Sequence, residues 1–107
     1  MGTIEAAAYI AKATEAEFQR AVIDAAAALG WVSIHFRQML GNPIGWPDLI
    51  LVGHGRTVYA ELKSERGKVS PKQAEWHHLL RQHGAEVHVW RPSDWSALVA
   101  VLNGTAD

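Results

Sequence analysis

The stretch that decides the fold is Gly45–Lys63, which has the sequence GWPDLILVGHGRTVYAELK. A turn rich in glycine and proline leads to Asp48 and then to a short apolar run. Gly53–Arg56 is typical of a β-hairpin turn. Beyond it, apolar and polar side chains alternate, so Glu61 and Lys63 share one face of a strand. We therefore expect two antiparallel strands that bring Asp48 opposite Glu61.

The first helix is predicted to begin at Thr14, because Thr14 and Glu17 fit the S/T-x-x-E capping box. Apolar residues at helical spacing follow, and Gly30 is the expected stop. Glu15 falls on the same side of this helix as the apolar stripe and should point inward, whereas Glu17 is assigned to the cap. Trp31–Arg37 then alternates in the way that is typical of a strand.

A second helix is predicted from Ser70, with Gln73 completing another capping box, to about residue 83. Ala85–Trp90 is the next expected strand, and a last helix should begin at residue 93 or 94 and end at 103–104. The order is α-β-β-β-α-β-α. A strand–helix–strand crossover makes its two strands parallel. This predicts an α/β fold (α+β, with a mixed sheet) for one domain over residues 14–104, preceded by an extension of uncertain order at residues 1–13.

The length, net charge and composition of the chain exclude several classes of protein. A chain of 107 residues suits one domain, and its net charge of −1 shows no overall basic excess. The absence of cysteine excludes disulfides, iron–sulfur clusters and cysteine zinc sites. His77 and His78 are adjacent, so on a helix they cannot chelate one ion together, and we expect no zinc site. We find no membrane span or signal peptide and expect a cytoplasmic protein, in the host cytoplasm if the source is a phage.

Asp48 and Glu61 are the residues best placed to do chemistry. Two carboxylates side by side repel each other unless a cation bridges them, and hard oxygen ligands suit Mg²⁺ or Mn²⁺. Lys63 could hold an attacking water or a phosphate on the same face, and Glu15 could supply a further carboxylate or a contact through water. Each element alone has a structural alternative, because Pro-Asp is a common turn pair and Glu-x-Lys is often a cross-strand ion pair.

A nucleic-acid surface, if present, should be local. The segment from residue 56 to residue 72 holds five basic residues and two glutamates, although ordinary solvated charges would give the same pattern. His35 could contact phosphate or be structural. Trp46 could stack on a base or pack at a subunit interface. The DNA-binding candidates are His35, Arg56, Arg66, Lys68 and Lys72.

From about Thr14 to Leu102 the chain resembles the VRR-NUC branch of the PD-(D/E)xK nucleases, especially small stand-alone versions from phages and bacteria. The matching segments are residues 14–19 (TEAEFQ), 45–49 (GWPDL), 58–63 (VYAELK), 67–73 (GKVSPKQ) and 87–92 (VHVWRP). The resemblance implies a restriction-endonuclease-like core. The loop between His35 and Asp48 looks shorter than in some relatives, which leaves the substrate preference open.

The resemblance also implies roles for individual residues. Asp48, Glu61 and the backbone carbonyl of Leu62 would bind Mg²⁺ or Mn²⁺, and Lys63 would be the catalytic lysine. Glu15 matches a helix-one glutamate, and Gln73 matches a glutamine near the site. The implied activity is metal-dependent hydrolysis of DNA, by a homodimer acting on branched DNA or Holliday junctions. The alternatives are an exonuclease or nickase that cuts simple ends with a partner, and a non-catalytic DNA-binding module.

Overall fold

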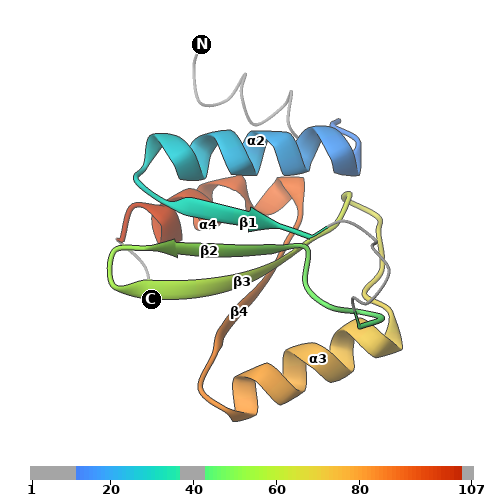
Figure 1. The fold of residues 1–107 in the computed structure, drawn as a ribbon. Coiled ribbons are helices and arrows are strands. Elements are labelled where there is room, and N and C mark those ends of the chain that lie inside the picture. Colours follow the sequence, from blue (N-terminus) through green and yellow to red (C-terminus); the bar gives the residue numbers. More distant parts are fainter. Residues whose placement is uncertain (1–11, 37–42, 105–107) are drawn as a thin grey trace.

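A computed structural model describes residues 12–36 and 43–104 of the chain (Figure 1). The elements in chain order are α2 (Glu15–Ala28), β1 (Val32–His35), β2 (Leu49–Gly53), β3 (Arg56–Leu62), α3 (Pro71–Gln82), β4 (Glu86–Trp90), the 3₁₀ turn η1 (Pro92–Asp94) and α4 (Trp95–Leu102). This order confirms the expected fold class. Most of the expected extension at residues 1–13, and residues 37–42 of the loop before Asp48, lie outside the described residues.

The sheet has the order β1-β2-β3-β4 and is mixed. The first three strands are antiparallel, and β3 pairs with β4 in parallel, as the crossover rule predicts. Between β2 and β3 the two central turn residues, His54 and Gly55, have φ angles of 52° and 72°. Such a two-residue turn matches the twist of the flanking strands. It fixes the register in which Leu49 faces Ala60.

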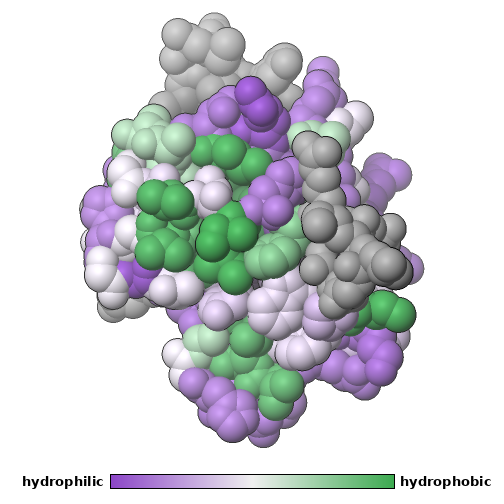
Figure 2. All heavy atoms as spheres, viewed as in Figure 1, coloured by the Kyte–Doolittle hydropathy of each residue, from purple (hydrophilic) through white to green (hydrophobic). Residues whose placement is uncertain are grey.

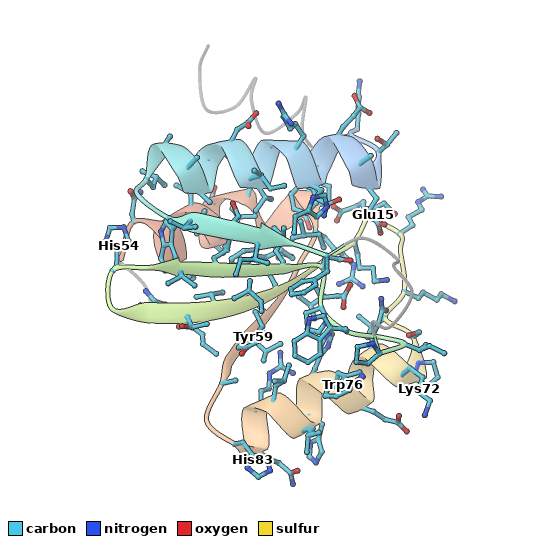
Figure 3. All side chains as sticks on the ribbon, in the orientation of Figure 1. Glu15, His54, Tyr59, Lys72, Trp76 and His83 are labelled. Carbon is cyan, nitrogen blue, oxygen red and sulfur yellow. The ribbon has the colours of Figure 1, made fainter. Side chains whose placement is uncertain are left out.

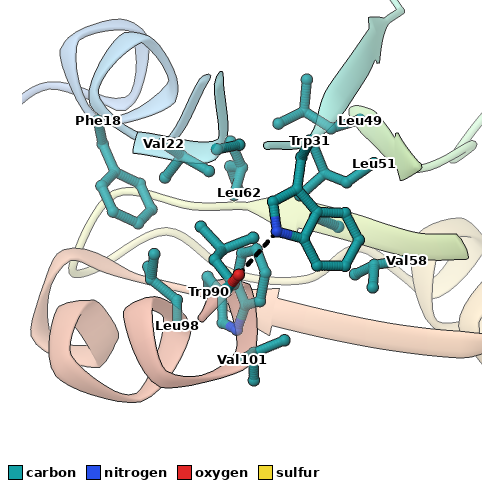
Figure 4. Close-up of a cluster of buried hydrophobic side chains, with 13 residues drawn as sticks. Phe18, Val22, Trp31, Leu49, Leu51, Val58, Leu62, Trp90, Leu98 and Val101 are labelled. Atoms are coloured by element: carbon teal, nitrogen blue, oxygen red, sulfur yellow. Dashed lines mark hydrogen bonds between the residues drawn. The ribbon is translucent and has the colours of Figure 1, made fainter. Parts of the chain in front are cut away.

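One face of the sheet carries the hydrophobic core, where α2 and α4 cover it (Figures 1 and 4). Phe18 and Val22 of α2 and Leu98 of α4 are fully buried against the strands. The indole of Trp31 lies in the same cluster and donates a 2.8 Å hydrogen bond to the backbone oxygen of Leu102. Burial of these side chains is the main force holding both helices on this face.

The other face of the sheet is only partly covered. α3 lies against β3 and β4 there, whereas the face of β1 and β2 is open to solvent. Val32, Ile34 and Val52 project from it with 67%, 48% and 43% of their surface exposed. The strand register sets Val32 beside Val52, and Figure 2 shows hydrophobic side chains gathered over these strands. We call these three side chains the open apolar face.

The helix ends follow the local sequence at α2 and α3, and at α4 they lie within two residues of the predicted ends, without a side-chain cap at Asp94. Both predicted capping boxes are present, at Thr14 and at Ser70. The last helix begins at Trp95, one or two residues after the expected start at residue 93 or 94, because η1 comes first. The Asp94 carboxylate accepts a hydrogen bond from the backbone of Arg91 instead of capping α4. In the described part of the chain, no helix has the length and apolar character needed to cross a membrane.

Candidate active site

Asp48 and Glu61 meet where β2 begins and β3 ends. The pairing of Leu49 with Ala60 carries Asp48, one residue earlier, to a position opposite Glu61, as the sequence predicts. Asp48 Oδ2 accepts a 2.9 Å hydrogen bond from the backbone nitrogen of Leu62. This bond holds the Asp48 side chain against β3, the strand that carries Glu61. The register of the β2–β3 hairpin therefore sets the distance between the two carboxylates.

Glu61 is a fully buried carboxyl held by α3. Its exposed fraction is 0%. Gln73 donates from Nε2 to Glu61 Oε2 over 3.2 Å, and His77 Nε2 lies 3.2 Å from Glu61 Oε1. Both oxygens therefore have a partner, which is the usual condition for burying a carboxyl group. Gln73 was expected here from the family resemblance, whereas the sequence predicted no role for His77 beyond excluding it, with His78, as a zinc chelate.

The orientation of the Gln73 amide is fixed by its second role as a helix cap. Gln73 Oε1 accepts a 2.8 Å hydrogen bond from the backbone nitrogen of Ser70. Ser70 Oγ accepts in return from the backbone nitrogen of Gln73 at 3.1 Å. An amide has one oxygen and one NH₂ group, so the oxygen used in the cap leaves the NH₂ group to face Glu61. The capping box thus also points a donor into the site.

The environment of Glu61 favours its protonated form in the absence of a cation. Burial is the largest of the causes that together raise the pKa of Glu61 to about 9 from an ordinary value of 4.5. A hydrogen bond with Asp48, the charge of Asp48 and the charge of Glu15 contribute to this rise in pKa, and the charge of Lys63 opposes it. A buried carboxyl next to a second carboxylate is a place where bound positive charge is stabilised.

The imidazole of His77 is held neutral in this pocket. Burial lowers the pKa of His77, and the charges of Arg81 and Lys63 lower it further against the opposing effect of Asp48. His77 is only 4% exposed, whereas the next residue, His78, is exposed. Helical geometry separates the two rings, as the sequence analysis anticipates. The site therefore gains a neutral hydrogen-bonding group instead of a competing cation.

Lys63 follows directly after β3 and is half-buried. Its backbone nitrogen donates a 3.0 Å hydrogen bond to Trp90, which continues the pairing with β4 by one residue. The charge of Lys63 acts on both Glu61 and His77. Its ammonium group is thus the basic group that the structure brings to the carboxylate pair.

The two glutamates of α2 have different surroundings. Glu17 is the capping residue, since its carboxylate accepts a 3.0 Å hydrogen bond from the backbone of Thr14. Glu15 is exposed to solvent, not buried as its place on the apolar stripe suggests. It nevertheless lies at the end of the sheet opposite His54 (Figure 3) and contributes to the raised pKa of Glu61. Glu15 is therefore at the rim of the site.

The loop before Asp48 is clamped to the start of α3. Gly45 has a φ of 86°, and a Cβ there would lie 2.6 Å from the carbonyl carbon of Lys72. Trp76 donates from Nε1 to the backbone oxygen of Ile44 at 3.1 Å. This contact fixes the loop that carries Asp48 against the helix that carries Gln73.

Trp46 belongs to an aromatic cluster in the same region. Its ring centroid lies 5.0 Å from that of Trp76, 6.0 Å from Tyr59 and 6.1 Å from Phe36, all in edge-to-face geometry. Aromatic pairs prefer this geometry because ring edges and faces carry opposite partial charge. In the folded chain Trp46 is thus an internal anchor of the loop that precedes Asp48.

The basic candidates are dispersed. Arg56 lies at the hairpin, at the far end of β3 from Glu61, where its guanidinium forms an ion pair with Glu86. Lys72 is exposed and lies 3.2 Å from a carboxylate oxygen of Glu75. Exposed basic side chains at residues 66 and 68 lie in the loop between β3 and α3, and exposed His35 pairs with Leu49 beside the site. Of the DNA-binding candidates, only Arg56 is separated from the carboxylates by the length of the strand.

The donor set suits a hard divalent cation. Asp48 and Glu61 offer carboxylate oxygens, which Mg²⁺ and Mn²⁺ prefer. Within residues 12–36 and 43–104 no group of three His, Cys, Asp or Glu side chains is gathered closely enough to hold a metal by itself. Mg²⁺ commonly binds through one or two carboxylates and completes its shell with water. Two carboxylates therefore fit such an ion, and ligation by the Leu62 carbonyl stays a prediction.

A mixed sheet with a carboxylate pair across a hairpin and a lysine two residues beyond the second acid defines a PD-(D/E)xK type of nuclease. The sequence model of the VRR-NUC domain matches residues 8–94, so the chain belongs to the VRR-NUC family and is a nuclease of that superfamily. This confirms the resemblance from which the site roles were expected. No curated protein sequence matches the chain.

Proposed function

We propose that this chain is a metal-dependent DNA endonuclease that cuts branched DNA as a homodimer. The observation that carries the catalytic part is the pairing of Asp48 with the buried Glu61, within reach of the charge of Lys63. Asp48 and Glu61 would hold Mg²⁺ or Mn²⁺, with Glu15 as a further contact through water. A bound cation of this kind would lower the pKa of a water and neutralise charge on the scissile phosphate.

The other side chains of the site position the reactants. The ammonium of Lys63 would orient the attacking water or hold the scissile phosphate by its charge, close to where negative charge develops. Gln73 keeps the Glu61 carboxylate in place through the bond from its Nε2. Burial of Glu61 keeps bulk water away from one side of the reaction.

Exposed basic residues near the site would bind the DNA backbone. His35 pairs with Leu49, next to Asp48, and the other candidates lie between the end of β3 and the first turn of α3; His35, Arg66, Lys68 and Lys72 would form the proposed surface. Arg56 is left out because it pairs with Glu86 at the hairpin. With a net charge of −1, the chain as a whole has little electrostatic attraction for DNA. A basic surface limited to these four residues favours a DNA substrate that is recognised by its shape through few phosphate contacts.

The experiment is a cleavage assay on a mobile four-way junction, a flap and a linear duplex, with Mg²⁺, Mn²⁺ or Ca²⁺. We expect cutting with Mg²⁺ or Mn²⁺, greatest on the junction. Asp48→Asn and Lys63→Ala should each lower the rate by at least about 100-fold, because the first weakens binding of the cation and the second removes a positive charge beside the reacting phosphate. Asp24→Asn, at an exposed acid of α2, is the matched control and should cut normally.

Each outcome of this assay has a defined meaning. No cutting with either Mg²⁺ or Mn²⁺ would overturn the enzyme proposal and leave a DNA-binding module. Preference for simple ends would replace the junction substrate with an exonuclease or nickase. Full activity in folded Asp48→Asn and Lys63→Ala proteins would contradict the site assignment.

A further inference from the structure

Two buried polar side chains stand out in the described part of the chain, and they contact each other. Glu61 is 0% exposed and His77 is 4% exposed. His77 lies on α3, four residues after Gln73, so the two residues occupy the same helix face. Family membership accounts for Glu61, and the resemblance accounts for Gln73, but neither assigns a role to His77.

Gln73 and His77 hold the Glu61 carboxylate from two directions. Gln73 Nε2 donates a hydrogen bond to Glu61 Oε2, and His77 Nε2 lies within hydrogen-bond distance of Glu61 Oε1. Both distances are 3.2 Å. With both oxygens engaged by one rigid helix, rotation of the carboxylate about its terminal bond is opposed. A carboxylate has about four lone-pair positions. Two hydrogen bonds therefore leave acceptor capacity on each oxygen for a cation.

The direction of the His77 bond follows from the state of Glu61 when it binds a cation. An ionised carboxylate only accepts hydrogen bonds, so the proton must be on His77 Nε2. Donors that orient metal-binding carboxylates are known to matter for affinity, because they fix the ligand before the metal arrives. His77 has the required burial, partner and distance.

We propose that His77 is a positioning residue, which donates from Nε2 to Glu61 and, with Gln73, holds that carboxylate ready to bind a divalent cation. The inference rests on the proposed metal-dependent function. It goes beyond that function by adding a residue that touches neither metal nor DNA, and by giving α3 a role in setting the affinity for metal.

The test compares substitutions at residue 77 in the full chain by calorimetric titration with Mn²⁺ alone. His77→Phe keeps a ring of similar shape and removes the donor. We expect its Mn²⁺ affinity to fall about 10- to 100-fold. His77→Gln places an amide nitrogen near the position of Nε2 and should recover a large part of the loss. His78→Phe, at the exposed neighbouring position, should bind Mn²⁺ as the unmodified chain does.

Cleavage kinetics and thermal melting accompany the titration. His77→Phe should lower kcat at a fixed Mn²⁺ concentration and leave KM for DNA unchanged, with recovery at high Mn²⁺. If His77→Phe does not fold, His77→Gln and His77→Asn carry the test. The asparagine side chain is shorter by one methylene and cannot reach Glu61, so it should bind Mn²⁺ more weakly than the glutamine variant.

The outcomes separate this inference from the proposed function. If the unmodified chain binds and cuts, but folded His77→Phe binds Mn²⁺ equally well, the positioning role is overturned and the function stands. Equal affinities in folded glutamine and asparagine variants would also overturn it, because donation would not matter. If the unmodified chain neither binds Mn²⁺ nor cuts DNA, both proposals fall.

Discussion

Glu61 is the residue at which stability and function oppose each other. A carboxyl with no exposed surface and a neighbouring carboxylate is costly to ionise, and this raises the pKa of Glu61 to about 9. In the unfolded chain the same group would titrate near 4.5. Between these values the folded protein holds a proton that the unfolded chain releases. The free energy of unfolding attributable to Glu61 must therefore fall as pH rises through this range.

This gives a prediction for the metal-free protein. In EDTA, stability should decrease from pH 7 to pH 9 by at most about 1.4 kcal/mol per pH unit. Added Mn²⁺ at pH 8 should reverse the loss, because a cation stabilises the ionised form. Urea unfolding at each pH, with and without Mn²⁺, measures the free energy of unfolding. The range begins at pH 7 because the lowered pKa of His77 makes stability rise with pH below that point.

Glu61→Gln supplies the control for the pH prediction. The amide has nearly the same shape and cannot ionise, so its unfolding free energy should stay flat where that of the unmodified chain falls. Parallel profiles for the two proteins would mean that Glu61 is not the group that titrates, and the account of its burial would have to be abandoned.

At this scale the sequence predicted the carboxylate pair but not its surroundings. Asp48 and Glu61 could be placed opposite each other because a two-residue turn fixes the register within a few residues. The contact of His77 with Glu61 spans 16 residues and depends on how α3 packs, which no local pattern encodes. Glu15 was predicted to point inward from the apolar stripe, but it is exposed, because it is the first residue of α2 and its exposure depends on where that helix begins relative to the sheet.

Among the contacts between elements, the one between the loop before Asp48 and α3 is the most sensitive to the addition of a single methyl group. Gly45 has a φ of 86°, which other residues adopt only with strain, and its missing Cβ would meet backbone atoms of Lys72 and Gln73. Backbone atoms of a helix cannot yield as a flexible side chain can. A side chain at residue 45 must therefore push Asp48 and α3 apart.

Gly45→Ala should lower the free energy of unfolding by about 2–4 kcal/mol, combining backbone strain with the clash. It should also reduce cleavage by more than the loss of folded protein explains. Gly84→Ala is the matched control, since Gly84 has the same φ of 86° with open space where the Cβ would be. Urea unfolding and cleavage rates compare the two. Equal effects would mean that the loop and α3 are not clamped as described.

The elements themselves were predictable wherever short-range chemistry defines them. Both capping boxes involve residues three apart, so Thr14 and Ser70 could be assigned without tertiary information. The 3₁₀ turn η1 before α4 was not predicted. The backbone nitrogen of Ser93 donates to the Glu65 carboxylate, 28 residues away, and Asp94 bonds to Arg91. These contacts stabilise η1, and α4 begins one or two residues after the position that local capping preferences favour.

Over the whole molecule, the pairing of the strands was predictable from the sequence. Which part of each sheet face the helices cover was not. The crossover through α3 requires β3 and β4 to be parallel neighbours, and they are. Alternation in β1 identifies two faces without saying which of them a helix will cover. The structure leaves Val32 and Ile34 on the open apolar face while Trp31 enters the core. That face is the feature that bears on assembly.

The open apolar face is where we expect a second copy of the chain to dock. Its three side chains carry no charge that would attract DNA, and they lie on β1, an edge strand of the sheet, and on the neighbouring strand β2. Exposed clusters of large aliphatic side chains commonly mark protein interfaces. A dimer interface buries about 800 Å² on each partner. These three side chains would form its apolar centre, with polar residues around them.

Replacing Val32 and Ile34 together by lysine should therefore yield a folded monomer. Both side chains are already 48% or more exposed, so charged groups there can be solvated without unfolding the chain. Leu79→Lys, at a residue of α3 that is 45% exposed, is the matched control and should remain dimeric. Light scattering at assay concentrations measures the mass of each protein. A monomeric unmodified chain, or a double variant that stays dimeric, would contradict the interface.

A monomer should also cut a four-way junction in one strand at a time, because paired incision needs two active sites in one assembly.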